Sequence, residues 1–331
     1  MLHFNDVYAM GVFSHQSLLL SDIVFIKMNT QFSPNTKTVA LIGAGAVGLC
    51  LAAAFMQAGW QVVVCGARAR FPQIEETEGT DTHTYSIRHA ATPADIGPCD
   101  TAILAVKSHQ TQDVSAWISA FNRASATFLV AQNGLGQKER VAAYAPHANI
   151  LPAIVYFNAQ RFAPGRVTLK RIGAYDLCVP DDAAAQYFAD VLQKGGMRVQ
   201  VTADMATALW LKLLANITAN PITTLTGRRT GIMQECAIQA AARQIMAEAV
   251  KVGQAEGAKL TAQHVEDILL WLQTIPAESV TSMLQDRQAG RELEYEALTG
   301  YVVKAAEKHG IDVPLNHLVL SLLSSIHPAH P

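Results

Sequence analysis

Three polar side chains recur at helical spacing within an apolar stretch in the second half of the chain. Lys212, Asn216 and Asn220 are spaced i, i+4 and i+8, so they line one face of a helix at about 3.6 residues per turn. The residues between them are mainly apolar, which predicts a buried helix, where unpaired polar groups are costly. Burial lowers the pKa of a lysine toward that of a useful proton donor, and the alternative interpretation is a hydrogen-bonded structural cluster. Pro221 disfavours helical geometry at Asn220, so we expect a kink or a helix end there.

A glycine-rich turn in the first half predicts a dinucleotide site. The pattern G-x-G-x-x-G follows the apolar run Thr38–Ile42, opens a helical pattern over Ala46–Gln57, and precedes a second apolar run, Gln61–Cys65. Its first glycine permits the tight turn, the second lets the backbone approach a pyrophosphate, and the third lets the helix pack on the strand. Free N–H groups at the helix start would face the phosphates, and a turn without ligand is the alternative. The cofactor-binding candidates here are Gly43, Ala44, Gly45, Ala46, Val47 and Gly48.

The end of the second apolar run distinguishes NAD from NADP. An NAD site places an Asp or Glu there to accept a hydrogen bond from the ribose 2′-hydroxyl. Here the residues after Cys65 are Gly66, Ala67 and Arg68, with no acid. Arg68 offers a guanidinium for a 2′-phosphate, and Arg70 is a second candidate, whereas a solvated surface arginine is the alternative. The missing carboxylate favours NADPH.

The sequence pattern around these candidate residues predicts a sheet in the first part of the chain and a bundle of helices in the second. Continuous apolar runs at residues 101–106, 127–131 and 150–156 are typical of parallel strands that are covered on both faces, and residues 167–169 and 175–179 suggest a hairpin at the sheet edge. After about residue 202 the patterns are helical, at 206–219, 236–255, 261–273, 291–309 and 314–325. The predicted fold class is α/β, with a Rossmann-like dinucleotide-binding domain, a second, all-helical domain, and the site in the cleft between them. The predicted divisions are an N-terminal extension at 1–34, with Met28 as the hypothetical natural start, an NADP-binding domain at 35–203 and a substrate domain at 204–331.

Composition excludes several classes of function. Hydrophobic residues make up 50% of the 331 residues and charged residues 16%, which argues against a disordered chain, and the net charge of -2 shows no basic excess for nucleic acid. The apolar stretch at 17–26 is too short for a membrane span. Five scattered cysteines without a C-x-x-C pair are typical of reduced thiols in a cytoplasmic protein. The histidines show no spacing typical of metal ligands, so we expect no metal, membrane or nucleic-acid partner.

From about Lys37 to about Leu322 the chain resembles the ketopantoate reductase (2-dehydropantoate 2-reductase) family. The shared motifs are the glycine turn, Ala105-Val106-Lys107, Gln132-Asn133-Gly134-Leu135-Gly136, Trp210-Leu211-Lys212-Leu213 with Asn216 and Asn220-Pro221, and Ser282-Met283-Leu284-Gln285-Asp286 with Ala289-Gly290-Arg291 and Glu294. The block that begins at Ser282 is the most specific of these.

The resemblance implies a role for each matching residue. Lys212 would be the general acid, and Glu294 the catalytic glutamate that holds substrate and helps to orient the lysine. Lys107 and Asn133 would lie at the nicotinamide end of the cleft, and Arg68 would read the 2′-phosphate. The implied substrate-binding residues are Asn216, Asn220 and Ser282.

Two segments depart from the family pattern and bear on substrate identity. The family commonly has Pro-Thr-Glu-Ile-Asp-Tyr where this chain has Glu292-Leu293-Glu294-Tyr295-Glu296-Ala297, and Val155-Tyr156-Phe157-Asn158 replaces a Thr/His-rich stretch. The expected reaction is NADPH-dependent reduction of ketopantoate to pantoate, a step toward pantothenate, with a homodimer as the candidate assembly. The alternatives are reduction of another branched or aromatic 2-oxo acid, and a non-catalytic NADPH-binding sensor.

Overall fold

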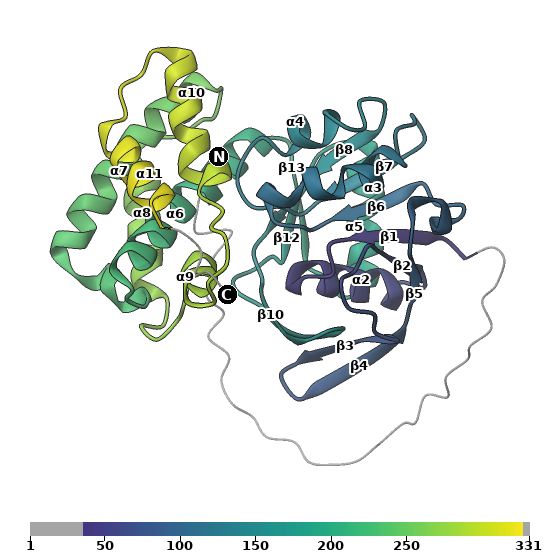
Figure 1. Cartoon of the computed structure of the whole chain (residues 1–331). Helices are drawn as coiled ribbons and strands as arrows, with labels where there is room; N and C mark the ends of the chain where they lie inside the picture. Colours follow the sequence, from purple (N-terminus) through teal and green to yellow (C-terminus); the bar gives the residue numbers. More distant parts are fainter. Residues whose placement is uncertain (1–35, 327–331) are drawn as a thin grey trace.

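A computed structural model describes residues 36–326 of the chain (Figure 1). The predicted N-terminal extension and the hypothetical start at Met28 lie outside the described residues. Within residues 36–326, every strand precedes residue 203, and the chain from Met205 onward is built of helices and their connections. Figure 1 shows the sheets and their helices on one side and the helices after Met205 on the other.

A six-stranded sheet, parallel throughout, forms the centre of the first half, as the continuous apolar runs predict. Its strand order is β5-β2-β1-β6-β7-β8. In such a sheet the ligand crevice lies outside the carboxyl ends of the strands, where the order reverses, which is here between β1 and β6. The bounds are β1 (Thr38–Ile42), β2 (Gln61–Cys65), β5 (Arg88–Ala90), β6 (Thr101–Leu104), β7 (Thr127–Val130) and β8 (Asn149–Pro152).

Helices cover both faces of this sheet, which confirms the predicted α/β class. Val39 and Leu41 of β1 belong to a core shared with helices α2 (Ala46–Gln57) and α5 (Ala183–Lys194). The alternate residues, Ala40 and Ile42, belong to the core on the opposite face, which includes residues in and around α3 (Ser115–Ser119) and α4 (Gln137–Ala142). Since side chains alternate along a strand, an apolar run without alternation is what a doubly covered sheet requires.

Two smaller sheets complete this half, and their pairing differs from the predicted hairpin. In the four-stranded sheet, β11 (Arg166–Lys170) pairs with β10 (Asn158–Ala163) and β3 (Gln73–Glu78), with β4 (Asp81–Ser86) beyond β3. In the three-stranded sheet, β12 (Leu177–Pro180) lies between β9 (Ile154–Val155) and β13 (Val199–Thr202).

The hairpin prediction for 167–169 and 175–179 was therefore wrong, because the two strands join different sheets. Both edges of β11 are paired, with β10 and β3, and both edges of β12 are paired, with β9 and β13, so neither strand has an edge free for the other. Ion pairs lie in the connection between them. Arg171 bonds Glu78 of β3 at 2.5 Å on one side and Asp176 on the other, and the fully buried Asp176 bonds Arg198 beside β13 at 2.7 Å. The pairs with Glu78 and Arg198 tie the connection to the neighbours of β11 and β12, whereas the Arg171–Asp176 pair joins the two ends of the connection itself.

The second half is a bundle around the long helix α6 (Met205–Thr226). Helix α6 contains Pro221 and continues beyond it, so it does not end at Asn220. Packing overrides the local preference here, since most of its residues from Thr207 to Thr224 are buried against neighbouring helices. The other helices are α7 (Cys236–Ala255), α8 (Ala262–Thr274), α9 (Ser282–Gln288), α10 (Tyr301–His309) and α11 (Pro314–Ser324).

The segment predicted as one helix over 291–309 is helical only in its second part. Residues 291–295 are irregular, and a π-helical turn over Glu296–Gly300 leads into α10. This irregular backbone lies against the sheet half, where Leu135 N donates to Ala297 O at 3.2 Å. Among residues 36–326, no helix has both the length and the apolar character that a bilayer crossing needs.

Candidate active site

The glycine turn after β1 has the shape of a phosphate cradle. Gly43 has φ +106, and a Cβ there would lie 2.5 Å from Val106 N, so only glycine fits. A Cβ on Gly48 would overlap Gly43 O, whereas a Cβ on Gly45 would come no closer than 3.9 Å to Ala105 O, which leaves this face of the turn open. Helix α2 begins at Ala46 with no side-chain cap and no acidic residue in its first turn. Its free N–H groups and the open backbone therefore fit a pyrophosphate.

Three arginines come from segments next to this cradle. Arg68 is exposed in the loop after β2, the strand next to β1, and Arg70 is also exposed. Arg161 comes from β10 in the four-stranded sheet, and its Nη1 donates to Ala44 O in the glycine turn at 3.3 Å. No local pattern in the sequence marks Arg161, because it reaches the turn only through the pairing of β10 with β11.

Lys107 and Asn133 follow β6 and β7, two adjacent strands of the central sheet. Parallel pairing places both at the carboxyl edge on the same side of the glycine turn. Asn133 is partly buried, and its side chain has no hydrogen-bond partner within residues 36–326. Gly134 beside it has φ +80, and a Cβ there would overlap Ala297 O of the helical half. The close approach of this loop to the helical half therefore depends on glycine.

An ion-pair cluster joins the two halves at this edge. Lys107 Nζ lies 2.8 Å from Glu294 Oε2 and 3.0 Å from Asp286 Oδ2, and Ser108 N donates to Glu294 Oε1 at 2.9 Å. Burial opposes the charge on Lys107, yet Glu294 and Asp286 raise its pKa. Burial likewise favours the protonated form of Glu294, but Lys107 and the Ser108 N–H hold its pKa below the ordinary value. Glu294 is therefore an ionised carboxylate bound to the sheet half.

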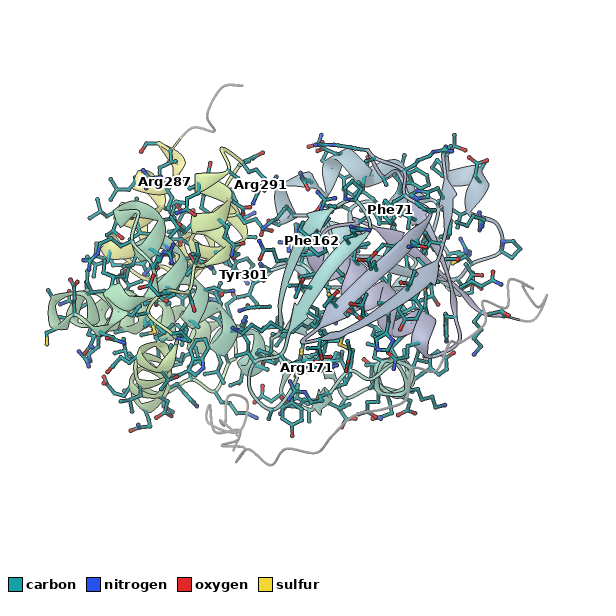
Figure 2. The ribbon with its side chains drawn as sticks, turned by 90° about the horizontal axis from the view of Figure 1, so that it is seen from below. Phe71, Phe162, Arg171, Arg287, Arg291 and Tyr301 are labelled. Atoms are coloured by element: carbon teal, nitrogen blue, oxygen red, sulfur yellow. The ribbon has the colours of Figure 1, made fainter. Side chains whose placement is uncertain are left out.

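Arg291 extends this cluster, since its Nε donates to the 4% exposed Asp286 at 2.9 Å. Figure 2 shows Arg291 and Tyr301 on the side of the helical half that meets the sheet half. The sequence motif contains Asp286 without indicating a role for it, because its partner Lys107 lies far away in the chain.

Lys212 points from the helical half toward the sheet half. The side chain is partly buried on α6, and its Nζ lies over the ring of Tyr156, just after β9, at 5.4 Å from the centroid. Burial lowers the pKa of Lys212 from 10.5 to about 8. Among the described residues Lys212 has no hydrogen-bond acceptor and no ion pair. A lysine with this pKa and an unoccupied ammonium can donate a proton near neutral pH.

The carboxylate of Glu294 does not bond Lys212, although the resemblance implies that it helps to orient the lysine. Both oxygens of Glu294 are taken by Lys107 and the Ser108 backbone. Glu294 therefore contacts Lys107 and Ser108, whereas Lys212 contacts the ring of Tyr156.

The remaining polar residues lie along α6 and at the start of α9. Asn216 is partly buried, one turn beyond Lys212. Asn220 is 6% exposed, and its Oδ1 accepts a hydrogen bond from Met283 N at 3.5 Å. This contact brings Asn220 next to Ser282, which is exposed at the first position of α9. Helix α6 thus presents an ammonium and two amides in a row, with a hydroxyl close to the far end.

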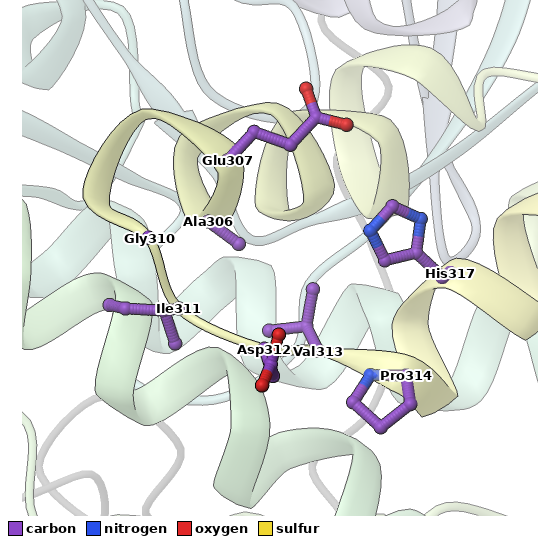
Figure 3. A pocket seen from close by; sticks show the side chains of 8 residues that line it. All are labelled: Ala306, Glu307, Gly310, Ile311, Asp312, Val313, Pro314 and His317. Carbon is purple, nitrogen blue, oxygen red and sulfur yellow. The ribbon is translucent and has the colours of Figure 1, made fainter.

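A cavity of about 530 Å³ lies between the end of α10 and the start of α11 (Figure 3). Its polar side chains, Glu307, Asp312 and His317, are all exposed. None of the residues predicted for the site lines this cavity, so it is not part of the candidate active site.

Comparison with known proteins assigns both halves to one family. Residues 39–179 match the family "Ketopantoate reductase PanE/ApbA", and residues 204–327 match "Ketopantoate reductase PanE/ApbA C terminal". The chain is 34% identical over 288 residues to a 2-dehydropantoate 2-reductase of Mycobacterium tuberculosis, an alignment that covers 87% of this chain and 97% of the relative.

Solved structures agree with this assignment. A dimeric ketopantoate reductase from Staphylococcus aureus superimposes with a TM-score of 0.77 at 29% identity, covering 87% of this chain and 98% of the other. A D-mandelate dehydrogenase with NADH and anilino(oxo)acetate has the same fold, with a TM-score of 0.78 at 20% identity, over 87% of this chain and 97% of the other. The chain therefore belongs to the ketopantoate reductase family and is an oxidoreductase of the 2-dehydropantoate 2-reductase type.

Proposed function

We propose that this protein reduces 2-dehydropantoate to pantoate with NADPH, a step toward pantothenate, in the cleft between the sheet half and the helical half. One observation carries the proposal: the Lys212 ammonium, which has no acceptor among the described residues, points from α6 toward the sheet half and has a pKa lowered to about 8. We place the boundary between the NADP-binding and substrate domains near residue 203, where the last strand ends and α6 begins.

The cofactor preference follows from charge at the phosphate end. The open glycine turn and the uncapped start of α2 fit a pyrophosphate. Arg68 follows β2, where an NAD site would have a carboxylate, so its guanidinium would bind a 2′-phosphate. Arg161, which contacts Ala44 O, adds a second cation beside the turn. Both charges favour NADPH over NADH.

In the reaction, the helical half handles the substrate. When bound, NADPH supplies the hydride that reaches the keto carbon of the substrate. Lys212 donates the proton that the carbonyl oxygen acquires as the hydride arrives. Asn216, Asn220 and Ser282 bind the polar groups of the keto acid along α6 and α9.

The residues at the strand ends complete the cleft. Lys107 and Asn133 hold the nicotinamide end, and Glu294 anchors the helical half to Lys107 and positions the substrate beside it. A homodimer is the proposed assembly, supported by the dimeric Staphylococcus aureus relative.

A second candidate function is the same reduction of an aromatic 2-oxo acid. The aromatic ring of Tyr156 lies beneath the Lys212 ammonium, in the segment that departs from the family pattern. Neither candidate requires a different catalytic residue, so only the substrate distinguishes them.

Steady-state oxidation of NADPH with a panel of 2-oxo acids tests both candidates. The panel should contain ketopantoate, unbranched and branched aliphatic acids and aryl 2-oxo acids, and each should be repeated with NADH. We expect the highest kcat/KM for ketopantoate with NADPH. A higher value for an aryl acid would replace the first candidate by the second, and a preference for NADH would overturn the role of Arg68. Tight NADPH binding without turnover of any acid would leave the sensor interpretation.

A further inference from the structure

A partly buried arginine with no assigned role contacts the Asn133 loop. Arg140, in α4, turns its side chain back toward the loop between β7 and α4. Its Nη1 donates to Leu135 O at 2.6 Å, and its Nε donates to Gln132 Oε1 at 3.3 Å. Its Nη2 is buried and has no hydrogen-bond partner within residues 36–326. A buried guanidinium with a missing partner is costly, so the fold retains it at a price in stability.

Gln132 joins the two loops that carry Lys107 and Asn133. Its side chain is 4% exposed, and its Nε2 donates to Val106 O at 3.1 Å and to Thr111 Oγ1 at 2.9 Å. These acceptors flank Lys107 in the loop after β6. Because Arg140 occupies Oε1, the amide of Gln132 is held in the one orientation that lets its nitrogen bond both acceptors.

The charge of Arg140 also suits this place. Burial lowers the pKa of its guanidinium, and attraction to Glu294 opposes that effect most strongly. Glu294 is bonded directly by Lys107 and Ser108 N, so Arg140 is a more distant cation on the same carboxylate. The arginine thus touches neither the predicted substrate nor the predicted cofactor positions, but it contacts the frame that holds them.

We propose that Arg140 is a positioning residue for the reductase proposed above, and that its two-armed contact with Gln132 and Leu135 holds the Lys107 and Asn133 loops in mutual register. The proposal rests on the proposed function for its kinetic consequences. Its structural part, the order of residues 132–136, is independent of any turnover.

The fork geometry, rather than the charge alone, performs this role. Nε and Nη1 of a guanidinium lie in one rigid plane and reach two acceptors together, which a lysine ammonium on a flexible stem does not reproduce. Arg140→Gln removes both fork and charge, whereas Arg140→Lys keeps the charge. Lys138→Gln is the matched control, because it removes an exposed positive charge from the same helix.

Hydrogen–deuterium exchange of the full-length protein tests the structural part. The amide of Leu135, which donates to Ala297 O, reports directly on the loop. We expect exchange of the peptide covering residues 132–136 to accelerate about tenfold in both Arg140 variants and to stay unchanged in Lys138→Gln. Unchanged exchange in folded Arg140→Gln and Arg140→Lys proteins would overturn the proposal. If Arg140→Gln fails to fold, Arg140→Lys decides alone.

Kinetics test the consequence for the site. We expect each Arg140 variant to raise the Kd of NADPH, measured by cofactor fluorescence, and to lower kcat about tenfold, with a smaller change in KM for the keto acid. If Arg140→Lys has the kcat of wild type, the guanidinium geometry is not required and the proposed two-armed contact is wrong. Gln132→Met combined with Arg140→Gln should lower kcat by much less than the product of the single effects, because the two residues act as one unit. A wild-type protein without turnover would refute the proposed function, and the exchange experiment would still decide the role of Arg140.

Discussion

Replacing Lys212 by methionine should stabilise the protein while abolishing its activity. The folded-state pKa of Lys212 is about 8, below its ordinary value of 10.5, because burial disfavours the charged form. The unfolded chain therefore binds the proton more tightly, and protonated Lys212 destabilises the fold below pH 8. Each unit of difference between the unfolded and folded pKa corresponds to about 1.4 kcal/mol, so protonated Lys212 destabilises the fold by about 3 kcal/mol at pH 6.5.

The pH dependence of this gain is as diagnostic as its size. As the pH rises from 8 to 10.5, Lys212 is neutral in the folded state and loses its proton in the unfolded state, so the destabilisation shrinks and disappears above that window. Lys212→Met should therefore raise the free energy of unfolding by about 2–3 kcal/mol at pH 6.5 and by about half of that or less at pH 9.5. The corresponding rise in Tm at pH 6.5 is a few degrees.

Urea denaturation of wild type and variant at the two pH values measures both quantities. Lys251→Met is the control, because Lys251 is an exposed lysine on α7, and its replacement should change little at either pH. A Lys212→Met protein no more stable than wild type at pH 6.5 would show that the buried ammonium does not destabilise the fold. A gain of equal size at both pH values would show that packing, and not the buried charge, is responsible.

Three other substitutions probe the cofactor end, the contact between the halves and a buried acid. Arg68→Gln should raise KM for NADPH about tenfold and leave KM for NADH nearly unchanged, as steady-state assays with each cofactor will show. Gly134→Ala should lower the free energy of unfolding by about 2–4 kcal/mol in urea, because φ is +80 and the added Cβ overlaps Ala297 O. A loss below about 1 kcal/mol would contradict that contact. Burial raises the pKa of Glu76 from 4.5 to about 7, so the free energy of unfolding falls as the pH rises through that window. Glu76→Gln should therefore stabilise the protein by about 1–3 kcal/mol at pH 8 and have little effect at pH 4.5. A gain that does not depend on pH would contradict the raised pKa of Glu76.

Sequence patterns correctly predicted the glycine turn with its flanking strand and helix, the parallel sheet and the helix that carries Lys212. The strand, glycine turn and helix from Thr38 to Gln57 lie together in the chain, and a Cβ on Gly48 would overlap Gly43 O within the turn itself. The continuous apolar runs predicted the parallel sheet, because strands that are covered on both faces need apolar residues at every position. The i, i+4 spacing of Lys212 and Asn216 likewise predicted a shared helix face, because a helix converts sequence spacing directly into position.

What sequence reasoning missed depends on contacts between distant segments. Strands β11 and β12 join different sheets because strands from elsewhere in the chain occupy both edges of each, which no local pattern announces. The partner of Glu294 is Lys107 and not Lys212, since the irregular backbone before α10 turns this carboxylate toward the sheet half. Packing around α6 similarly overrode the helix-ending tendency of Pro221.

We propose above that the Lys212 ammonium protonates a keto acid bound next to the nicotinamide. The rate of hydride transfer in a single turnover, followed by NADPH absorbance after mixing the Lys212→Ala protein and NADPH with ketopantoate, tests it most directly. We expect a rate lower than that of wild type by a factor of about 10²–10⁴, with the Kd of NADPH changed by less than about threefold. A variant that transfers hydride at the wild-type rate would exclude Lys212 as the proton donor.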